Sequence, residues 1–323
     1  MKFLIAGFGS IGRRHFRNLR ALGQDDVLFL RSGRSQLPTQ ELIGVPAETE
    51  LDAALAHQPD AVIIANPTSK HLEVAIPAAQ AGCHILLEKP ISHSMSGVDA
   101  LVKAVEESGS RVLVGFQFRF HPGLQAAREV LLTGELGQPL RASVRWGEYL
   151  PDWHPWEKDF RESYSARGDL GGGVVLTLSH PFDYLHWLFG RVTALTGTTS
   201  NSGELGIEVE ERAEARLEFA SGATAEVELD YLQKPPIHQL EIECAAGRLH
   251  WDALTDVLTK HRAEGGPPED FERNDLFLAQ MQHFIEVVAG QAAPSCTLAD
   301  GIHALEIALA VHQSAERGAK VLL

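Results

Sequence analysis

Six residues near the start of the chain, GFGSIG from Gly7 to Gly12, match the pattern G-x-G-x-x-G. They follow an apolar run and open a helix-like segment, and in this context the pattern binds the pyrophosphate of a dinucleotide. Gly7 permits the tight turn, Gly9 lets the backbone approach the phosphates, and Gly12 lets the helix pack on the strand. Backbone N–H groups at the helix start, around Ser10 and Ile11, complete the predicted phosphate site.

The second apolar run ends in LFLRSGRS, at the place that selects the adenosine ribose. A carboxylate there binds the ribose hydroxyls of NAD and repels the 2′-phosphate of NADP. Arg31 stands there instead, with Ser32 and Arg34 beside it. Because guanidinium and hydroxyl groups bind phosphate, we predict NADP(H) as the preferred cofactor, with NAD possible. The alternative is a turn with two solvated surface arginines.

The first 120 residues alternate short apolar runs with helix-like stretches, which is typical of a parallel sheet covered on both faces. We therefore predict an α/β domain, a doubly wound Rossmann fold, over residues 1–120. The expected strands are Lys2–Ala6, Val27–Arg31, Asp60–Ala65, His84–Leu87 and Arg111–Gly115. The expected helices are Gly12–Leu22, Leu51–His57, His71–Ala81 and Met95–Ser108, the last with Ser96 and Asp99 at capping-box spacing and Gly109 past its end.

After RFHPG the pattern changes. In AEARLEFASGATAEVELDYL, apolar residues alternate with polar, mostly acidic ones on both sides of an SG turn, which predicts antiparallel strands with one buried face. We also expect a strand at Leu140–Tyr149, a helix within GGGVVLTLSHPFDYLHWLFG, and two final helices. The last helix is expected to start at the capping-box pair Thr297 and Asp300 and to stop at Gly318. Residues 121–323 are thus predicted to form an α+β domain with a mainly antiparallel open sheet.

Two polar segments follow neighbouring strands of the predicted parallel sheet: NPTSKH after Asp60–Ala65, and EKP after His84–Leu87. Ligands of open parallel sheets bind beyond the carboxyl ends of the strands, so both segments are expected near the nicotinamide ring. The residues predicted to contact the cofactor at this edge are Asn66, Pro67, Thr68, His71, Glu88 and Lys89.

Lys89 has chemistry suited to the proton of an alcohol. A partly desolvated lysine beside a positively charged nicotinamide has a lowered pKa. Its amine can then hydrogen-bond the hydroxyl that loses its proton as hydride leaves the carbinol carbon, and it steadies the developing alkoxide. Pro90 restricts where the lysine points. The alternative is that Glu88 and Lys89 form a solvated pair that ends the strand.

GFGSIG, NPTSKH, EKPIS and the later GGG…SHPFD, in this order and spacing, resemble the Gfo/Idh/MocA oxidoreductases over essentially the whole chain. The resemblance implies a Rossmann domain followed by an α+β domain whose open sheet often mediates oligomerisation. It also implies reversible hydride transfer between a nicotinamide cofactor and a carbinol carbon, usually of a sugar, inositol or nucleotide-sugar. By position, Lys89 matches the family's catalytic lysine, Glu88 the acid beside it, and His180 the histidine after the glycine run.

The segment around His180 departs from the family's pattern. Members usually carry an Asp in a D-x-x-x-H-x-x-D arrangement, whereas here Thr177 stands in the nearest place, one residue closer to the histidine. Asp183 keeps its place and, on a helix, shares a face with His180, so it can orient the imidazole. Lys89 and His180 remain as the predicted catalytic pair; a satisfied core histidine is the alternative for His180. No ligand spacing supports a metal site that includes His186, so none is predicted.

Two segments carry aromatic and charged side chains that suit a sugar. FQFRFHP leaves the fifth strand, and an aromatic, polar loop follows Leu140–Tyr149. Aromatic rings, carboxylates and guanidinium groups match the alternating C–H and O–H surface of a carbohydrate, and arginines also bind a carboxylate or diphosphate. The predicted substrate-binding residues are Arg119, His121, Tyr149, Asp152, Trp153, His154, Arg167, Thr177 and Asp183. The alternative is that half of these pack or lie on the surface.

The formal net charge of −15 argues against nucleic acid and anionic membrane surfaces as partners. The three scattered cysteines indicate reduced thiols, and neither a signal peptide nor a membrane span is recognisable, which predicts a cytoplasmic protein. The half-polar strands favour a homo-oligomer. A non-catalytic cofactor or sugar sensor on the same fold, or a reductase of a non-sugar substrate, remains an alternative function.

Overall fold

The computed structural model describes residues 1–33, 39–153, 158–255, 257–260, 263–265 and 271–323. Two predicted site residues, Arg34 and His154, lie outside the described residues. The chain divides into two compact units. Unit 1 comprises residues 1–117, 169–171 and 273–302, and unit 2 comprises residues 118–168, 172–272 and 303–323. The division at residue 120 stays a prediction, and it did not include the return of residues 273–302 to unit 1.

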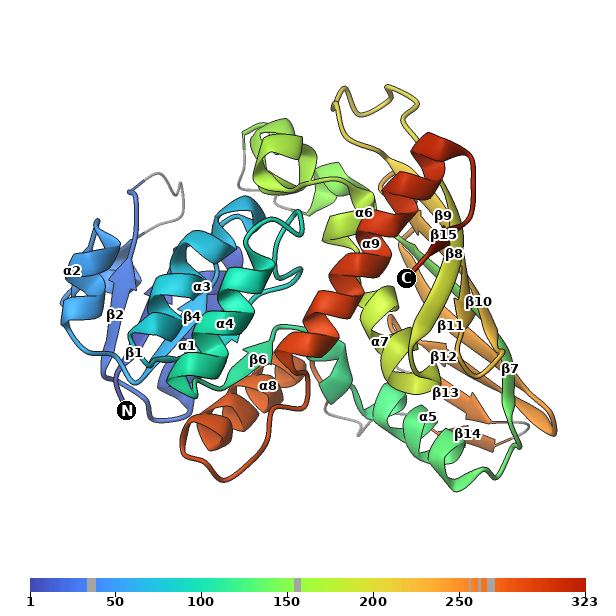
Figure 1. Cartoon of the computed structure of the whole chain (residues 1–323), viewed down its shortest axis with the longest axis horizontal. Helices are drawn as coiled ribbons and strands as arrows, with labels where there is room; N and C mark the ends of the chain where they lie inside the picture. Colours follow the sequence, from blue (N-terminus) through green and yellow to red (C-terminus); the bar gives the residue numbers. More distant parts are fainter. Residues whose placement is uncertain (34–38, 154–157, 256, 261–262, 266–270) are drawn as a thin grey trace. The chain divides into compact units, whose positions relative to one another are not determined.

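Unit 1 is built on a parallel sheet of six strands in the order β3-β2-β1-β4-β5-β6 (Figure 1). The strands are β1 (Phe3–Ala6), β2 (Val27–Leu30), β3 (Ala47–Glu48), β4 (Ala61–Ile64), β5 (His84–Leu87) and β6 (Val112–Val114). All described pairings between them are parallel, and the strand order reverses direction between β1 and β4, as in a doubly wound fold. The predicted Rossmann fold is confirmed, with β3 as an additional strand.

The helices of unit 1 lie on the faces of this sheet because its apolar strands are buried on both sides. They are α1 (Ser10–Ala21), α2 (Leu51–Ala56), α3 (His71–Gln80), α4 (Val98–Ser108) and α8 (Arg273–Val288), with short helices η1 (Gln40–Leu42) and η2 (Thr68–Lys70).

The largest difference from the predicted helix boundaries of unit 1 is at the start of α4. The predicted start of α4 at Met95 is wrong, because Gly97 caps the helix in a left-handed conformation (φ +84°) and no side chain caps it. The end of the same helix at Gly109 is confirmed, since this glycine is the C-cap with φ +70°.

Unit 2 contains a sheet of nine described strands in the order β14-β13-β12-β11-β7-β10-β9-β8-β15 (Figure 1). The strands are β7 (Pro139–Gly147), β8 (Val192–Ser200), β9 (Arg212–Phe219), β10 (Thr224–Asp230), β11 (Ile237–Cys244), β12 (Gly247–Asp252), β13 (Val257–Lys260), β14 (Ala263–Gly265) and β15 (Val321–Leu322). Each described pairing is antiparallel except that of β7 with β10. The predicted mainly antiparallel sheet is confirmed.

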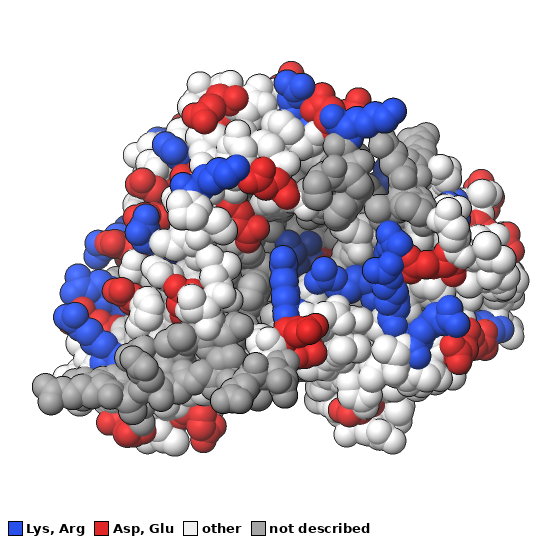
Figure 2. Space-filling model, turned by 180° about the vertical axis from the view of Figure 1, so that it is seen from behind, with Lys and Arg blue, Asp and Glu red and all other residues white. Residues whose placement is uncertain are grey.

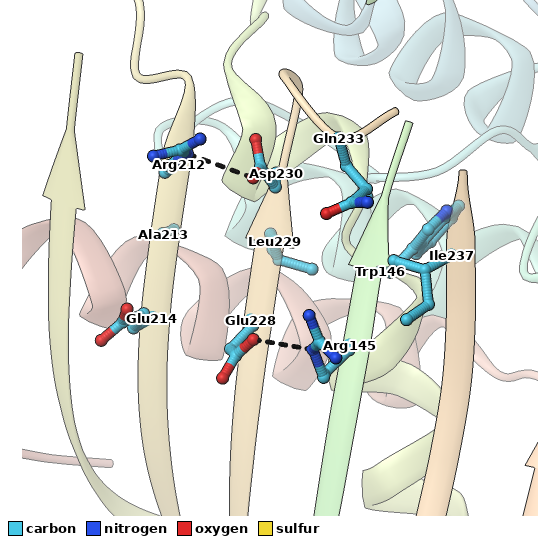
Figure 3. Close-up of a pocket in the computed structure, with 11 residues that line it drawn as sticks. Arg145, Trp146, Arg212, Ala213, Glu214, Glu228, Leu229, Asp230, Gln233 and Ile237 are labelled. Carbon is cyan, nitrogen blue, oxygen red and sulfur yellow. Dashed lines mark hydrogen bonds and ion pairs between the residues drawn. The ribbon is translucent and has the colours of Figure 1, made fainter. Parts of the chain in front are cut away.

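The two faces of this sheet differ in polarity, as the period-two pattern predicts. Ala215 and Leu217 of β9 are buried, and so are Val227 and Leu229 of β10. The opposite face carries ion pairs between neighbouring strands (Figure 3). These pairs are Arg141–Glu243, Arg145–Glu228, Arg212–Asp230 and Arg216–Glu226.

The helices of unit 2 include α5 (Pro122–Thr133), α6 (Val174–Thr177) and α7 (His180–Phe189). The predicted single helix over the glycine-rich segment is therefore two helices, separated at Leu178 and Ser179. Pro181 lies in the first turn of α7, where its missing N–H costs no helical hydrogen bond, so it starts the helix rather than kinking it.

Helix α9 (Leu298–Arg317) begins and ends where the sequence predicts. The Thr297 N–H donates to Asp300 Oδ2 at 2.8 Å, and the Asp300 N–H donates to Thr297 Oγ1 at 3.2 Å. This reciprocal pair is the predicted capping box. Gly318 follows with φ +60°, which closes the helix.

Lys and Arg side chains are interspersed with Asp and Glu side chains on the face drawn in Figure 2. The acidic excess therefore forms no single patch there. Cys83, Cys244 and Cys296 are buried and form no disulfide. In the described part of the chain no helix combines the length and apolarity needed to cross a bilayer.

Candidate active site

The glycine turn of unit 1 has a backbone geometry that only glycine permits. Gly7 has φ +104°, and a Cβ there would lie 2.8 Å from the Ala65 carbonyl oxygen. A Cβ on Gly12 would lie 2.3 Å from the Gly7 carbonyl oxygen. At Gly9, in contrast, a Cβ would meet no atom within 4 Å, so this peptide faces open space at the N-terminus of α1. The turn therefore fits a pyrophosphate.

Arg31 follows β2 and lies beside the glycine turn. Its guanidinium carbon is 5.6 Å from the centroid of the Phe8 ring, within the GFG segment. The N–H of Gly7 donates to the Leu30 carbonyl at 2.9 Å, which holds the end of β2 against the turn. Ser32 is exposed next to Arg31. The predicted ribose-phosphate residues that are described thus lie at the carboxyl end of β2.

Two arginines of α1 that were not predicted bind a glutamate of η1. Arg13 and Arg17 of α1 both donate hydrogen bonds to the carboxylate of Glu41 in η1, the Arg17 bond being 2.6 Å long. The hydrogen bonds from Arg17 and then Arg13 lower the pKa of Glu41 to about 2. Sequence reasoning missed Glu41 because 24 residues separate it from its nearer partner in the chain.

The segment Glu88–Pro90 continues from β5 and is held by its neighbours. The Glu88 N–H donates to the Ile64 carbonyl of β4 at 3.1 Å. The Glu88 side chain is buried, and its Oε1 lies 2.7 Å from Nε2 of His15. The Lys89 N–H donates to Glu88 Oε2 at 3.3 Å, and the Lys89 side chain is half-buried. Sequence reasoning missed His15, for which the signal is its place on the buried face of α1.

The segment Asn66–His71 follows β4, which pairs with β5 so that Ile64 lies opposite Leu87. Both ring nitrogens of His71 face backbone carbonyls: Nδ1 lies 2.9 Å from the Pro90 oxygen and Nε2 lies 3.0 Å from the Asn66 oxygen. Burial lowers the pKa of His71, and the Glu88 carboxylate and the carbonyl oxygens oppose this effect. The imidazole therefore joins the two polar segments at the sheet edge.

The remaining residues of this segment differ in exposure. The Asn66 side chain donates to the Lys70 carbonyl at 3.1 Å and is partly exposed, as is Pro67. Thr68 is buried, and a Cβ added to Gly171 would lie 3.0 Å from the Cβ of Thr68. All of them lie at the carboxyl end of β4, where ligands of such sheets bind.

In unit 2, Arg119 and Asp183 form a buried ion pair. The Arg119 Nη2 lies 2.6 Å from Asp183 Oδ1, and its Nε lies 3.0 Å from Oδ2. Their side chains are only 3% and 2% exposed. Both were predicted to bind substrate, whereas in the structure they form hydrogen bonds with each other.

His180 lies at the start of α7 within a cluster of aromatic rings. Its ring centroid is 4.9 Å from that of Phe118 and 5.5 Å from that of Trp146. His238 stacks on Trp146 with 4.3 Å between centroids. Sequence reasoning missed Trp146 and His238 because they meet only through the pairing of β7 with β11.

His121 and Thr177 are also buried in unit 2. The Gly123 N–H donates to His121 Nδ1 at 3.0 Å, so this imidazole caps α5. The His121 ring also packs edge-on against Trp251, with 4.9 Å between centroids. Thr177 ends α6 beside the phenol of Tyr231.

Lys234, which was not predicted, contacts two of the predicted loop residues. Lys234 Nζ lies 2.8 Å from Asp152 Oδ2 and 4.7 Å from the centroid of the Tyr149 ring. Trp153 packs edge-on against Tyr231, and Arg167 is exposed.

The described residues also line a pocket on the polar face of the unit 2 sheet (Figure 3). Its walls include Arg145, Arg212, Glu228 and Asp230, and it is lined by none of the predicted site residues that the structure describes. Across the described ranges, no group of three or more His, Cys, Asp or Glu side chains is placed to hold a metal ion.

Two family models match the chain in succession. Residues 1–116 match the oxidoreductase family with an NAD-binding Rossmann fold, and residues 124–250 match the GFO/IDH/MocA C-terminal domain. The chain belongs to the Gfo/Idh/MocA oxidoreductases. The resemblance carried by GFGSIG, NPTSKH and EKPIS is confirmed.

The chain is also similar to relatives along most of their length. The chain is 27% identical to 1,5-anhydro-D-fructose reductase of Ensifer adhaerens over 88% of this chain and 83% of the relative. It is 27% identical to D-xylose 1-dehydrogenase (NADP(+)) 2 of Haloferax volcanii over the full length of both. The WlbA dehydrogenase from Bordetella pertussis, solved with NADH and UDP-GlcNAcA, superposes with a TM-score of 0.82, 24% identity and coverage of 100% and 97%, which shows the shared fold. Family and relatives indicate an NAD(P)-dependent dehydrogenase that acts on CH–OH groups.

Proposed function

We propose that this oxidoreductase prefers NADP(H) and transfers hydride between the nicotinamide and a carbinol or carbonyl carbon of a sugar, inositol or nucleotide-sugar. The observation that carries the proposal is the position of Lys89. It follows β5 at the carboxyl edge of the Rossmann sheet, in a segment that is hydrogen-bonded on both sides. We further propose a cytoplasmic location, which the three buried, unbridged cysteines support.

The residues of unit 1 suit a dinucleotide. The Gly7–Gly12 turn and the N-terminus of α1 would hold the pyrophosphate, and Arg31 and Ser32 would hold the ribose phosphate. When bound, the nicotinamide supplies the hydride acceptor or donor. The segments after β4 and β5 would hold the ring at the sheet edge, which positions Lys89 beside the reacting carbon.

Lys89 and His180 are the proposed catalytic residues. In the oxidative direction the Lys89 amine accepts a hydrogen bond from the substrate hydroxyl and takes its proton. In the reductive direction the ammonium returns that proton and stabilises negative charge on the oxygen. His180 is the proposed second proton carrier, and the buried pair of Arg119 and Asp183 fixes the helix on which it stands.

The preference for NADP(H) depends on Arg31. Substitution Arg31→Asp places a carboxylate at the end of β2, which repels a 2′-phosphate and accepts ribose hydroxyls. We expect it to weaken NADPH binding at least ~10-fold, equal to about 1.4 kcal/mol, and to strengthen NADH binding. Arg20→Asp, on the exposed face of α1, is the control with the same charge change. Equal effects of both substitutions on NADPH binding would refute a specific role for Arg31.

A substrate screen tests the proposed reaction. Purified protein is incubated with NADP(H) or NAD(H) and a panel containing D-xylose, 1,5-anhydro-D-fructose, myo-inositol and UDP-N-acetylglucosamine, and the absorbance of the reduced nicotinamide is followed. The proposal expects turnover with at least one carbohydrate and higher kcat/KM with NADP(H) than with NAD(H). Tight NADPH binding without turnover on any carbohydrate would favour a non-catalytic binding protein instead.

The protein is also proposed to form a homo-oligomer through the polar face of the unit 2 sheet. Arginines and carboxylates alternate on that face, so a second copy related by a two-fold axis can oppose unlike charges (Figure 3). Sedimentation velocity of the wild type and of Arg145→Glu tests this. The expected result is an oligomer that the substitution dissociates; a monomeric wild type would refute it.

A further inference from the structure

We infer that His15 and His71 are positioning residues that hold the segment Glu88–Pro90 from its two sides and thereby aim Lys89. The inference rests on the proposed function, in which Lys89 handles the substrate proton. It adds two residues, one on α1 and one on α3, that need not touch the substrate.

His15 holds the first residue of the segment. Its ring is completely buried, and Nε2 lies 2.7 Å from Glu88 Oε1. The other nitrogen, Nδ1, is buried and has no hydrogen-bond partner in the described part of the chain. The imidazole therefore directs its one polar contact at Glu88, which requires a proton on Nε2 when Glu88 is ionised.

The other oxygen of the Glu88 carboxylate, Oε2, lies near Gly115. A Cβ on Gly115 would lie 3.0 Å from Glu88 Oε2 and 3.1 Å from Glu88 Cα, so a larger residue there would crowd the carboxylate. The Gly115 N–H donates to the Leu87 carbonyl at 2.7 Å, which keeps the two strands together at this point. One carboxylate oxygen thus contacts His15 and the other lies near Gly115, which restricts the carboxylate next to Lys89.

His71 holds the last residue of the segment. It is 2% exposed, and its ring nitrogens lie 2.9 Å from the Pro90 oxygen and 3.0 Å from the Asn66 oxygen. Since both partners are acceptors, the neutral imidazole donates to one of them and the protonated imidazole donates to both. The ring ties the segment after β5 to the segment after β4 whenever Nδ1, which faces Pro90, carries a proton.

Lys89 therefore lies between two residues that neighbouring helices hold in place. A lysine side chain has four rotatable bonds, so the direction of its amine depends on a fixed backbone. His15 also stands three residues after Gly12, on the helix whose N-terminus forms the proposed pyrophosphate site. The same helix thus connects dinucleotide binding with the position of the lysine.

The contact between His15 and Glu88 has an electrostatic consequence for Lys89. A donor on the carboxylate compensates part of its negative charge. Substitution His15→Leu removes that compensation, so the carboxylate stabilises the neighbouring ammonium more strongly. Substitution Glu88→Gln removes the charge itself and has the opposite effect. A general loss of packing would move Lys89 in the same direction in both variants, toward a solvent-exposed lysine.

Competitive acetylation of the full-length protein measures this effect without a substrate. The rate at which acetic anhydride modifies Lys89 is followed by mass spectrometry as a function of pH. We expect the midpoint to rise by about 0.5–1 pH unit in His15→Leu, to fall in Glu88→Gln, and to stay near the wild type in His15→Gln, whose amide nitrogen replaces Nε2. Equal midpoints in His15→Leu and His15→Gln, or shifts of one sign in His15→Leu and Glu88→Gln, would overturn the inference.

A matched pair of substitutions tests His71. His71→Asn replaces Nδ1 and keeps the bond to Pro90, whereas His71→Gln replaces Nε2 and keeps the bond to Asn66. At saturating NADPH, turnover with the most active carbohydrate of the screen should fall by about 10-fold or more in His71→Gln and by less in His71→Asn. Equal turnover in the two variants would contradict the role of the Pro90 contact.

Lys89→Met separates this inference from the proposed function. If Lys89→Met keeps normal turnover, the proposed function is wrong whatever the histidine variants do. If Lys89→Met is inactive while His15→Leu leaves both the acetylation midpoint and turnover unchanged, only the positioning role is wrong. Should His15→Leu fail to fold, His15→Met takes its place as the variant without a donor: its midpoint should rise while that of Glu88→Gln falls, and an unchanged midpoint in His15→Met would overturn the inference.

Discussion

The ion pair between Arg119 and Asp183 gives a prediction that separates two roles for these residues. They were predicted from the sequence to bind substrate, and the structure joins them by hydrogen bonds of 2.6–3.1 Å. Substitution Asp183→Leu removes one partner and leaves the guanidinium without its carboxylate in a site where the pair is almost fully buried. If the pair is structural, this substitution should destabilise unit 2.

The magnitude follows from the burial. Removing one member of a buried pair leaves an uncompensated charge and costs about 3–5 kcal/mol. For a folding unit of this size, that loss corresponds to a fall in melting temperature of about 6–20 °C. The double substitution Arg119→Met with Asp183→Leu removes both charges, and most of the lost stability should return because no buried charge remains.

Tryptophan fluorescence suits this measurement. The four described tryptophans, Trp146, Trp153, Trp187 and Trp251, all belong to unit 2, so their emission reports its unfolding. The melting temperature should fall strongly in Asp183→Leu. In the double variant, most of that loss should be recovered. If Asp183→Leu melts within about 2 °C of the wild type but has a KM raised more than about 10-fold, the structural role is refuted and the substrate-binding role is supported.

Two further predictions concern the glycine turn of unit 1 and the response of the whole protein to pH. Gly12→Ala would place a methyl group 2.3 Å from the Gly7 oxygen, so we expect NADPH affinity to fall at least ~10-fold by fluorescence titration, and unchanged affinity would contradict the tight turn. Burial lowers the pKa of His71 and of His303 in the folded chain. In the pH range between these lowered pKa values and the ordinary value of about 6.5, the two imidazoles are therefore more protonated in the unfolded chain than in the folded chain. The free energy of unfolding by urea should therefore decrease as the pH falls from about 7 to 5, and a value that increases over this range would contradict the burial of these imidazoles.

The parts of the molecule that the sequence predicted are those set by local rules. The Rossmann sheet follows from apolar strands alternating with helices, and the turn at Gly7 and Gly12 follows from a backbone that admits only glycine. The capping box of Thr297 and Asp300 needs only three residues of separation. Each of these signals lies within a few residues of the feature it specifies.

The parts that it missed depend on partners far apart in the chain. Arg119 and Asp183 are 64 residues apart, and His15 and Glu88 are 73 apart, so no periodicity relates them. A charged or imidazole side chain is compatible with a substrate contact and with a buried partner alike, and only the tertiary packing decides between them. The break between α6 and α7 was also not predicted, because the apolar pattern continues across it.

Turnover of Lys89→Met, measured beside NADPH affinity, tests the central claim most directly. The substitution keeps most of the unbranched side chain and removes its amine, and Lys70→Met, which changes an exposed lysine at the same sheet edge, is the control. We predict that Lys89→Met lowers kcat by at least ~10²-fold while NADPH affinity changes less than about 3-fold and Lys70→Met stays near the wild type. Near-normal turnover in Lys89→Met would contradict the account.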